Sequence, residues 1–196
     1  MKHQHSLANQ KIVLLLGYLQ LGGAEKQALT LAQGLKKSGA KSVEIWGYGS
    51  SGVVIEFASS LGIPTQILPS PNLDSTTSIA RSVLLLSKKL RQHSITTILP
   101  FTTRPNVIAG LSWRLGGASQ CWWNQRDEGR DLVPTLAMKT ALRLSTGALS
   151  NAHFSLTVLH QKLKFKSQNS HVIRNGLSPS PPTIQRNEWR NILGIS

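Results

Sequence analysis

Residues 11–39 read KIVLLLGYLQLGGAEKQALTLAQGLKKSG, and this segment alone indicates the type of fold. It opens with a continuous apolar run, residues 11–16, which is typical of a strand buried on both faces of a parallel sheet. A turn with glycines follows at 17–23, and from Ala24 apolar residues recur at helical spacing until Gly39 ends the pattern. The segment therefore predicts a strand, a turn and a helix that packs back on the sheet.

The same alternation of apolar runs and helical patterns continues along the chain. We expect strands at 42–46, 63–68, 95–99, 119–124, 147–150 and 171–173, and helices at 24–37, 53–61, 79–93, 106–115, 134–144 and 153–165. Solid apolar strands that alternate with helices favour right-handed crossovers and a doubly wound parallel sheet, a Rossmann-like three-layer α/β/α fold. Such sheets bind ligands at the carboxyl ends of their strands. The loops that follow the strands are 17–23, 47–52, 69–78, 100–105, 124–133, 150–153 and 174–178.

The two ends of the chain differ in composition from this core. Residues 1–10 lack the apolar run of a secretory signal and are expected to form a flexible N-terminus. Residues 11–177 hold all the alternating strands and helices, so we expect one domain there. The segment SPSPPT, residues 178–183, has the composition of an extended linker, and residues 186–193 have the pattern of a further helix.

Composition limits the class of protein. The 196 residues include 22 Lys and Arg against 8 Asp and Glu, a formal charge of +14, which suits nucleic acid, an anionic membrane face or phosphorylated small molecules. The single cysteine, Cys121, excludes a disulfide scaffold and a thiolate metal site, and we expect it to be a small buried residue. No apolar run approaches the roughly 20 residues of a membrane helix, so we expect a cytoplasmic chain.

Gly22 and Gly23 stand immediately before the first predicted helix. The exposed N–H groups and the dipole at a helix N-terminus favour an anion, and glycine lets a ligand approach the backbone closely. The sequence has neither the G-x-G-x-x-G pattern nor a P-loop. An ordinary tight turn between strand and helix explains the two glycines equally well.

The segment Leu19–Gly39, with its Gly-Gly-Ala-Glu sequence and long helix, resembles the opening of the family-4 retaining glycosyltransferases, which have the GT-B fold. Further segments resemble this family in the same order along the chain. They are SVEIW at 42–46, LGIPTQIL at 61–68, TRPNVIAGLSWRLGG at 103–117, LSNAHFSL at 149–156, HVIRNGL at 171–177 and WRNILGIS at 189–196. The resemblance covers nearly the whole chain.

This resemblance implies a function and a missing partner domain. GT-B enzymes have two Rossmann-like domains, of which the N-terminal one mostly binds the acceptor and the C-terminal one holds the nucleotide-sugar donor. The chain would then be the N-terminal half, with residues 178–196 as the linker and the start of an absent donor-binding domain. The family's Glu-x7-Glu donor motif does not occur in this sequence. The resemblance implies transfer of a sugar, of the hexosyltransferase type, to a lipid-linked, polysaccharide or small-molecule acceptor, and background turnover by this chain alone.

Three more residues become candidates for the site. Arg126 lies about where many members of the family have a histidine that contacts the transferring sugar, so it is the candidate catalytic residue. Its guanidinium suits a phosphate or carboxylate, although a salt bridge to Asp127 or to the other acidic residues of its loop is an equal alternative. Arg104 would meet the acceptor. Asn175 joins Gly22, Gly23 and the two arginines as a candidate for binding the donor diphosphate or the acceptor, although turn formation alone explains an Asn-Gly pair.

No metal or other cofactor is expected beyond the nucleotide-sugar co-substrate. His3 and His5 lie in the polar N-terminus without a third ligand nearby in the sequence. Trp122 and Trp123 lie within an apolar run and are expected to pack in the core rather than to stack on bases.

A second class of function is a basic Rossmann-like module that binds nucleic acid or an anionic surface without catalysis. The sequence contains no recognition helix, RNA-binding sheet or zinc-finger signature, so nucleic acid is the weaker partner. A third interpretation refines the first. In it, the basic surface docks on the inner face of an anionic membrane while the cleft takes a lipid-linked acceptor.

Overall fold

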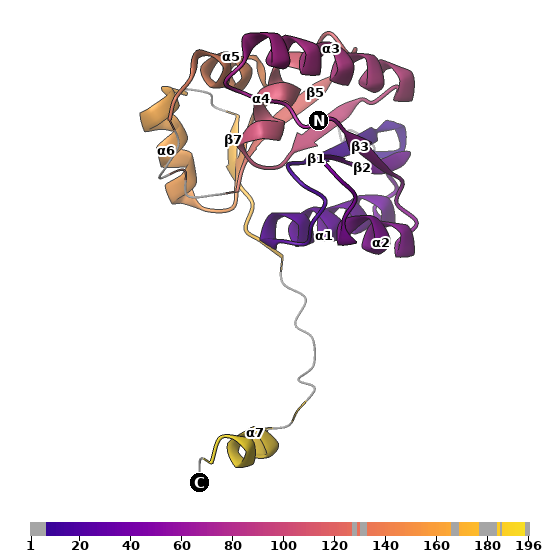
Figure 1. Ribbon diagram of the computed structural model, residues 1–196, viewed down its shortest axis with the longest axis vertical. Helices are drawn as coiled ribbons and strands as arrows, with labels where there is room; N and C mark the ends of the chain where they lie inside the picture. Colours follow the sequence, from indigo (N-terminus) through magenta and orange to yellow (C-terminus); the bar gives the residue numbers. More distant parts are fainter. Residues whose placement is uncertain are drawn as a thin grey trace, which may run out of the picture.

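Seven parallel strands form one sheet in the order β3-β2-β1-β4-β5-β6-β7, with helices on both faces (Figure 1). The computed structural model describes residues 7–126, 129, 133–165, 169–176, 184 and 186–194. The strands are β1 (Lys11–Leu16), β2 (Ser42–Tyr48), β3 (Thr65–Leu68), β4 (Thr97–Pro100), β5 (Gln120–Gln125), β6 (Gly147–Ser150) and β7 (Ser170–Val172). This confirms the predicted doubly wound parallel sheet.

The helices are η1 (Leu7–Asn9), α1 (Gly23–Lys37), α2 (Val53–Ser60), α3 (Thr76–His93), α4 (Thr103–Ser112), α5 (Leu136–Leu144), α6 (His153–Leu163) and α7 (Arg186–Ile192). Helices α1 to α6 connect successive strands, while η1 precedes β1 and α7 follows β7. In the part of the chain that the structure describes, none of them is long and apolar enough to cross a membrane. The expected linker at 178–183 lies outside the described residues, and α7 lies apart from the sheet (Figure 1).

The direction of strand addition reverses at β1. This strand pairs with β2 on one side and with β4 on the other, so the chain adds strands outward in both directions from the pair β1 and β4. Such a switch point opens a crevice at the carboxyl ends of the strands, where α/β sheets bind their ligands.

Strand β1 is apolar throughout because both of its faces are covered. Leu14 and Leu16 belong to the core cluster that includes residues of α1 and α2. Val13 and Leu15 belong to a second cluster, which includes residues of α3 and α4 on the opposite face. All four side chains are fully buried, so the sheet is the middle layer of three, as the continuous apolar run predicted.

A third cluster joins α4, α5 and α6 to β5 and includes the fully buried Trp123. Cys121 is also fully buried, and Trp122 is half-buried. The prediction that these residues of β5 pack in the core is therefore confirmed. Gly110 of α4 lies so close to α5 that a Cβ there would be 2.6 Å from the carbonyl oxygen of Ala141.

Capping side chains move two helix starts away from their predicted positions. Helix α3 begins three residues earlier than expected because the Ser75 hydroxyl accepts a hydrogen bond of 3.3 Å from the Ser78 N–H. Helix α5 begins two residues later, because Thr135 caps it by accepting from the Met138 N–H at 3.2 Å. Ser75 lies in a segment that was predicted to be a loop, whereas Thr135 lies within the predicted helix 134–144.

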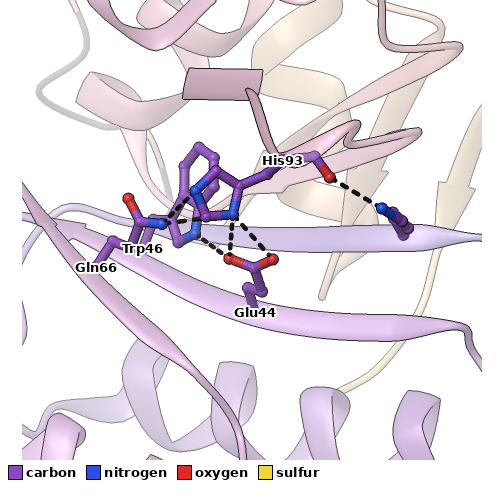
Figure 2. Close-up of polar contacts among 5 residues, drawn as sticks. Glu44, Trp46, Gln66 and His93 are labelled. Atoms are coloured by element: carbon purple, nitrogen blue, oxygen red, sulfur yellow. Dashed lines mark hydrogen bonds and ion pairs between the residues drawn. The ribbon is translucent and has the colours of Figure 1, made fainter. Parts of the chain in front are cut away.

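A polar cluster ties the end of α3 to the amino edge of the sheet (Figure 2). His93 Nδ1 lies 3.2 Å from Glu44 Oε2, and His93 Nε2 lies 2.7 Å from Gln66 Nε2. The Trp46 indole N–H donates to the same Glu44 carboxylate at 2.8 Å. These contacts lie at the start of β2 and β3, opposite to the edge where ligands bind, so we assign them a structural role.

Candidate functional site

A cavity of about 1000 Å³ opens at the switch point of the sheet. Its walls come from the loops that follow β1, β3, β4 and β5, and from the first turns of α4 and α5. Four of the loops expected at the carboxyl edge thus contribute to it: 17–23, 69–78, 100–105 and 124–133.

Arg104, a candidate for acceptor binding, lies in the wall of this cavity. Its Nη1 donates to the Tyr18 hydroxyl at 3.2 Å and to the Ser70 hydroxyl at 3.4 Å. The guanidinium carbon is 5.6 Å from the centroid of the Tyr18 ring. Among the described residues no carboxylate forms an ion pair with Arg104, so the cavity holds a positive charge whose polar contacts are neutral.

The first turn of α4 contributes two backbone donors to the same wall. Thr102 precedes the helix at φ +72° and ψ 172° and makes no side-chain cap. The N–H groups of Thr103 and Arg104 therefore lack a partner in the described structure, and Pro105 has no N–H to satisfy. Because proline is tolerated in the first helical turn, α4 begins at Thr103, three residues before the predicted start.

Arg126, the candidate catalytic residue, directly follows β5. Its Nη1 donates to Asn175 Oδ1 at 2.8 Å, and its guanidinium carbon is 5.0 Å from the centroid of the Phe101 ring. Burial lowers the pKa of the Arg126 guanidinium. Its Nε is buried and has no hydrogen-bond partner among the described residues.

Gly22 and Gly23 begin α1, and a short bridge connects this helix to Arg126. Gln27, in the second turn of α1, donates to the Gly176 carbonyl at 2.8 Å and accepts from the Gly176 N–H at 3.0 Å. Gly176 follows Asn175, the residue that binds Arg126. The structure therefore links four of the five candidates, while Arg104 lies in the separate wall of the cavity.

The glycines are not required by the backbone conformation. Gly22 has φ −121°, which any residue adopts. A Cβ on Gly23 would meet nothing within 4 Å, and α1 has no side-chain cap. A Cβ on Gly22 would lie 2.6 Å from Glu25 Oε2, so the Glu25 carboxylate lies beside the start of α1, and only the Gly23 side of this N-terminus is open.

Two buried hydrogen bonds hold α4 against β5. Asn106 Nδ2 donates to the Asn124 carbonyl at 3.0 Å, and the Asn124 N–H donates to Asn106 Oδ1 at 2.8 Å. Asn106 lies two residues after Arg104, and Asn124 lies two residues before Arg126. The pair therefore fixes the two elements that carry the two arginines.

Sequence reasoning found the loops but not all of their side chains. Tyr18, Ser70, Phe101 and Gln27 were missed, because a loop position does not show which side chain turns toward an arginine. Asn175 does more than form a turn, since its side chain binds Arg126. The acidic residues proposed as alternative partners of Arg126 lie outside the described residues.

Comparison with known proteins gives the fold a context. No protein-family model matches the sequence, and a comparison with curated proteins finds no relative. A glycosyltransferase from Rickettsia africae ESF-5 matches with a TM-score of 0.69 and 16% identity, over 86% of this chain and 44% of that one. Anabaena Alr3699/HepE, in complex with UDP and glucose, matches with a TM-score of 0.68 and 16% identity, over 95% of this chain and 50% of that one.

A third match is the apo form of the lipopolysaccharide outer core galactosyltransferase WaaB, with a TM-score of 0.68 and 13% identity, over 89% of this chain and 48% of that one. At such identities the likeness is one of fold. The chain spans about half the length of these structures. Its fold is that of one Rossmann-like half of a GT-B glycosyltransferase.

Proposed function

We propose that the chain is the acceptor-side half of a glycosyltransferase that takes a sugar from a nucleotide-sugar donor. The observation that carries this proposal is Arg126. In a fold shared with glycosyltransferases, Arg126 places a half-buried guanidinium at the carboxyl edge, and among the described residues its Nε has no partner and no carboxylate pairs with it. Asn175 holds its orientation by accepting from Nη1.

Glycosyl transfer from a sugar nucleotide leaves a negatively charged diphosphate. Stabilising that charge as it develops is the main task of the site. Arg126 supplies a partly desolvated cation, and the N-terminus of α1 at Gly22 and Gly23 supplies backbone N–H groups and a favourable dipole. The structure of HepE in complex with UDP and glucose supports a nucleotide-sugar ligand for this fold.

The remaining features of the proposal follow the resemblance to family 4. A second domain would hold the nucleotide sugar, the reaction would retain the anomeric configuration, and no metal would be needed. The transferred sugar would be a hexose, and the acceptor would enter the cavity beside Arg104. The charge of +14 would favour binding of the protein to an anionic membrane face.

The test is nucleoside diphosphate release by the full product of the encoding gene, given a panel of sugar nucleotides and acceptors. Arg126→Gln should lower kcat/KM about 100-fold, as expected for loss of a transition-state donor. Arg126→Lys, which keeps the charge, should recover part of the rate. The matched control is Arg114→Gln, just after the C-terminal end of α4, where the Arg114 guanidinium carbon lies 4.8 Å from the centroid of the Trp113 ring. It should leave the rate unchanged.

Wild-type turnover that is insensitive to Arg126→Gln would contradict the role of Arg126. Robust turnover by the 196-residue chain alone would contradict its assignment as half of an enzyme. Salt-sensitive binding to duplex DNA in the absence of any transfer would favour the nucleic-acid alternative instead.

A further inference from the structure

We infer that the cavity at the switch point binds a phosphate ester that carries an aliphatic chain, with the phosphate at Arg104. This inference deepens the proposed function, because it gives the chemical class of the acceptor. The binding itself needs neither a sugar donor nor a second domain, so it is tested separately.

The phosphate end of the cavity is defined by donors without acidic partners. Among the described residues, the Arg104 guanidinium hydrogen-bonds only the hydroxyls of Tyr18 and Ser70, and hydroxyl groups can turn to donate to a bound anion. The free N–H groups of Thr103 and Arg104 lie at the same wall. Phosphate oxygens accept from several such donors at once, which suits this arrangement better than a neutral sugar hydroxyl does.

A buried hydroxyl lies close to the same arginine. Tyr48, the last residue of β2, is only 2% exposed, and its hydroxyl has no hydrogen-bond partner. Burial raises the pKa of Tyr48, while the positive charge of Arg104 acts on it in the opposite direction. The Tyr48 hydroxyl is therefore a further neutral polar group near Arg104.

Apolar side chains also line the cavity, together with polar ones such as Asn72 and Thr135. Leu73, Val107, Val133 and Met138 line it, and they come from three different segments of the chain. Val133 is 74% exposed, and Leu136, next to the lining residue Ala137, is 82% exposed. Apolar side chains this exposed gain stability when a hydrocarbon chain covers them. The cavity therefore offers a charged end and a hydrocarbon end, as an amphiphilic phosphate requires.

The charges around the opening agree with an anionic ligand. Asp74 is an acidic lining residue, but it is exposed, so solvent screens its charge. Lys139 and Arg143 are exposed on α5, the helix whose first turn forms part of the wall. Solvent screens these exposed charges too, so Arg104 is the cation that lines the described part of the cavity.

Calorimetric titration of the 196-residue chain tests this inference with three probes: octyl phosphate, inorganic phosphate and octyl glucoside, each below its micelle concentration. Octyl phosphate should bind about tenfold or more tightly than either of the others, since only it fills both ends of the cavity. Arg104→Gln should lower the affinity for octyl phosphate about tenfold or more, as expected for the loss of a charge-assisted hydrogen bond. Val133→Ser should weaken the binding of octyl phosphate and leave the affinity for inorganic phosphate unchanged.

The matched control is Arg114→Gln, which removes the same charge at the other end of α4 and should bind octyl phosphate like the wild type. Circular dichroism of each variant confirms folding before titration. Equal affinity for octyl glucoside and octyl phosphate would overturn the phosphate assignment. Equal losses in Arg104→Gln and Arg114→Gln would also overturn it, because binding would then depend on net charge alone.

Vesicles distinguish the two sources of such a ligand. If the phosphate ester belongs to a membrane lipid, the chain should sediment with phosphatidic acid vesicles, and octyl phosphate should release it. If the ligand is a free phosphate ester, the chain should bind octyl phosphate and leave the vesicles in solution. Both results support the inference. It is contradicted if the chain binds the vesicles, octyl phosphate does not compete for that binding, and Arg104→Gln does not weaken it.

Discussion

Replacing Gly110 by alanine tests the packing that forms one side of the cavity. The new Cβ would lie 2.6 Å from the carbonyl oxygen of Ala141 and 2.9 Å from its Cβ. Both atoms are close to the α5 backbone, so they cannot move without shifting that helix. Helix α5 carries the lining residues Ala137 and Met138, which a shift would displace.

The sign of the effect comes from two opposing contributions. Overpacking of a close contact costs about 1–3 kcal/mol, while alanine favours a helix over glycine by about 1 kcal/mol. Because the clash is with backbone, we expect the cost to exceed the gain and Gly110→Ala to destabilise the fold by about 1–2 kcal/mol.

Gly34→Ala is the matched control. Gly34 lies within α1, and a Cβ there would meet nothing within 4 Å. Only the helix preference remains, so this variant should gain about 0.5–1 kcal/mol. Urea unfolding followed by tryptophan fluorescence gives the change in unfolding free energy of each variant from the shift of its midpoint, provided that the m-value stays constant. If Gly110→Ala proves as stable as the wild type, or if both variants shift in the same direction, the close packing of α4 on α5 is wrong.

Three further predictions concern other parts of the fold. Asn106→Ala should destabilise the protein by about 1–3 kcal/mol, because it leaves the buried Asn124 N–H without an acceptor, and an unchanged melting temperature would refute that pairing. Burial raises the pKa of the Cys121 thiol, so this thiol should not react with a thiol reagent at mildly alkaline pH until the protein is denatured. Rapid labelling of the native protein would show that β5 is accessible. Gln27→Ala should speed hydrogen exchange at the Gly176 amide while changing stability by less than about 1 kcal/mol, and exchange at the wild-type rate would show that this hydrogen bond does not protect the amide.

Much of the fold could be predicted because its signals are local. A solid apolar run such as residues 11–16 is buried on both faces wherever it folds, and the strand–helix alternation allows few other topologies. Errors arose where a short-range polar contact competes with the apolar pattern. The Ser75 cap lets α3 begin earlier than predicted. Proline at position 105 led us to place the start of α4 after it, although the helix begins at Thr103.

The candidate site could be predicted only in part, because its contacts join distant segments. The glycines before α1 and the arginine after β5 lie at the carboxyl edge as soon as the sheet is parallel. The partner of Arg126 is 49 residues away, and no local pattern indicates that Asn175 will reach it. The same holds for Tyr18 and Arg104, which are 86 residues apart.

The central claim is that the edge formed by α1 and Arg126 receives the donor diphosphate, and NMR shift mapping with UDP tests it most directly. On addition of UDP to the ¹⁵N-labelled full product of the encoding gene, which would include the proposed donor-binding domain, the amides of Gly22 and Gly23 and the side-chain Nε–H of Arg126 should shift together. Amides at the opposite edge, such as those of Lys11 and Thr96, should stay in place. Shifts at Lys11 and Thr96 with none at the two glycines, or no shift anywhere at high UDP concentration, would contradict the claim.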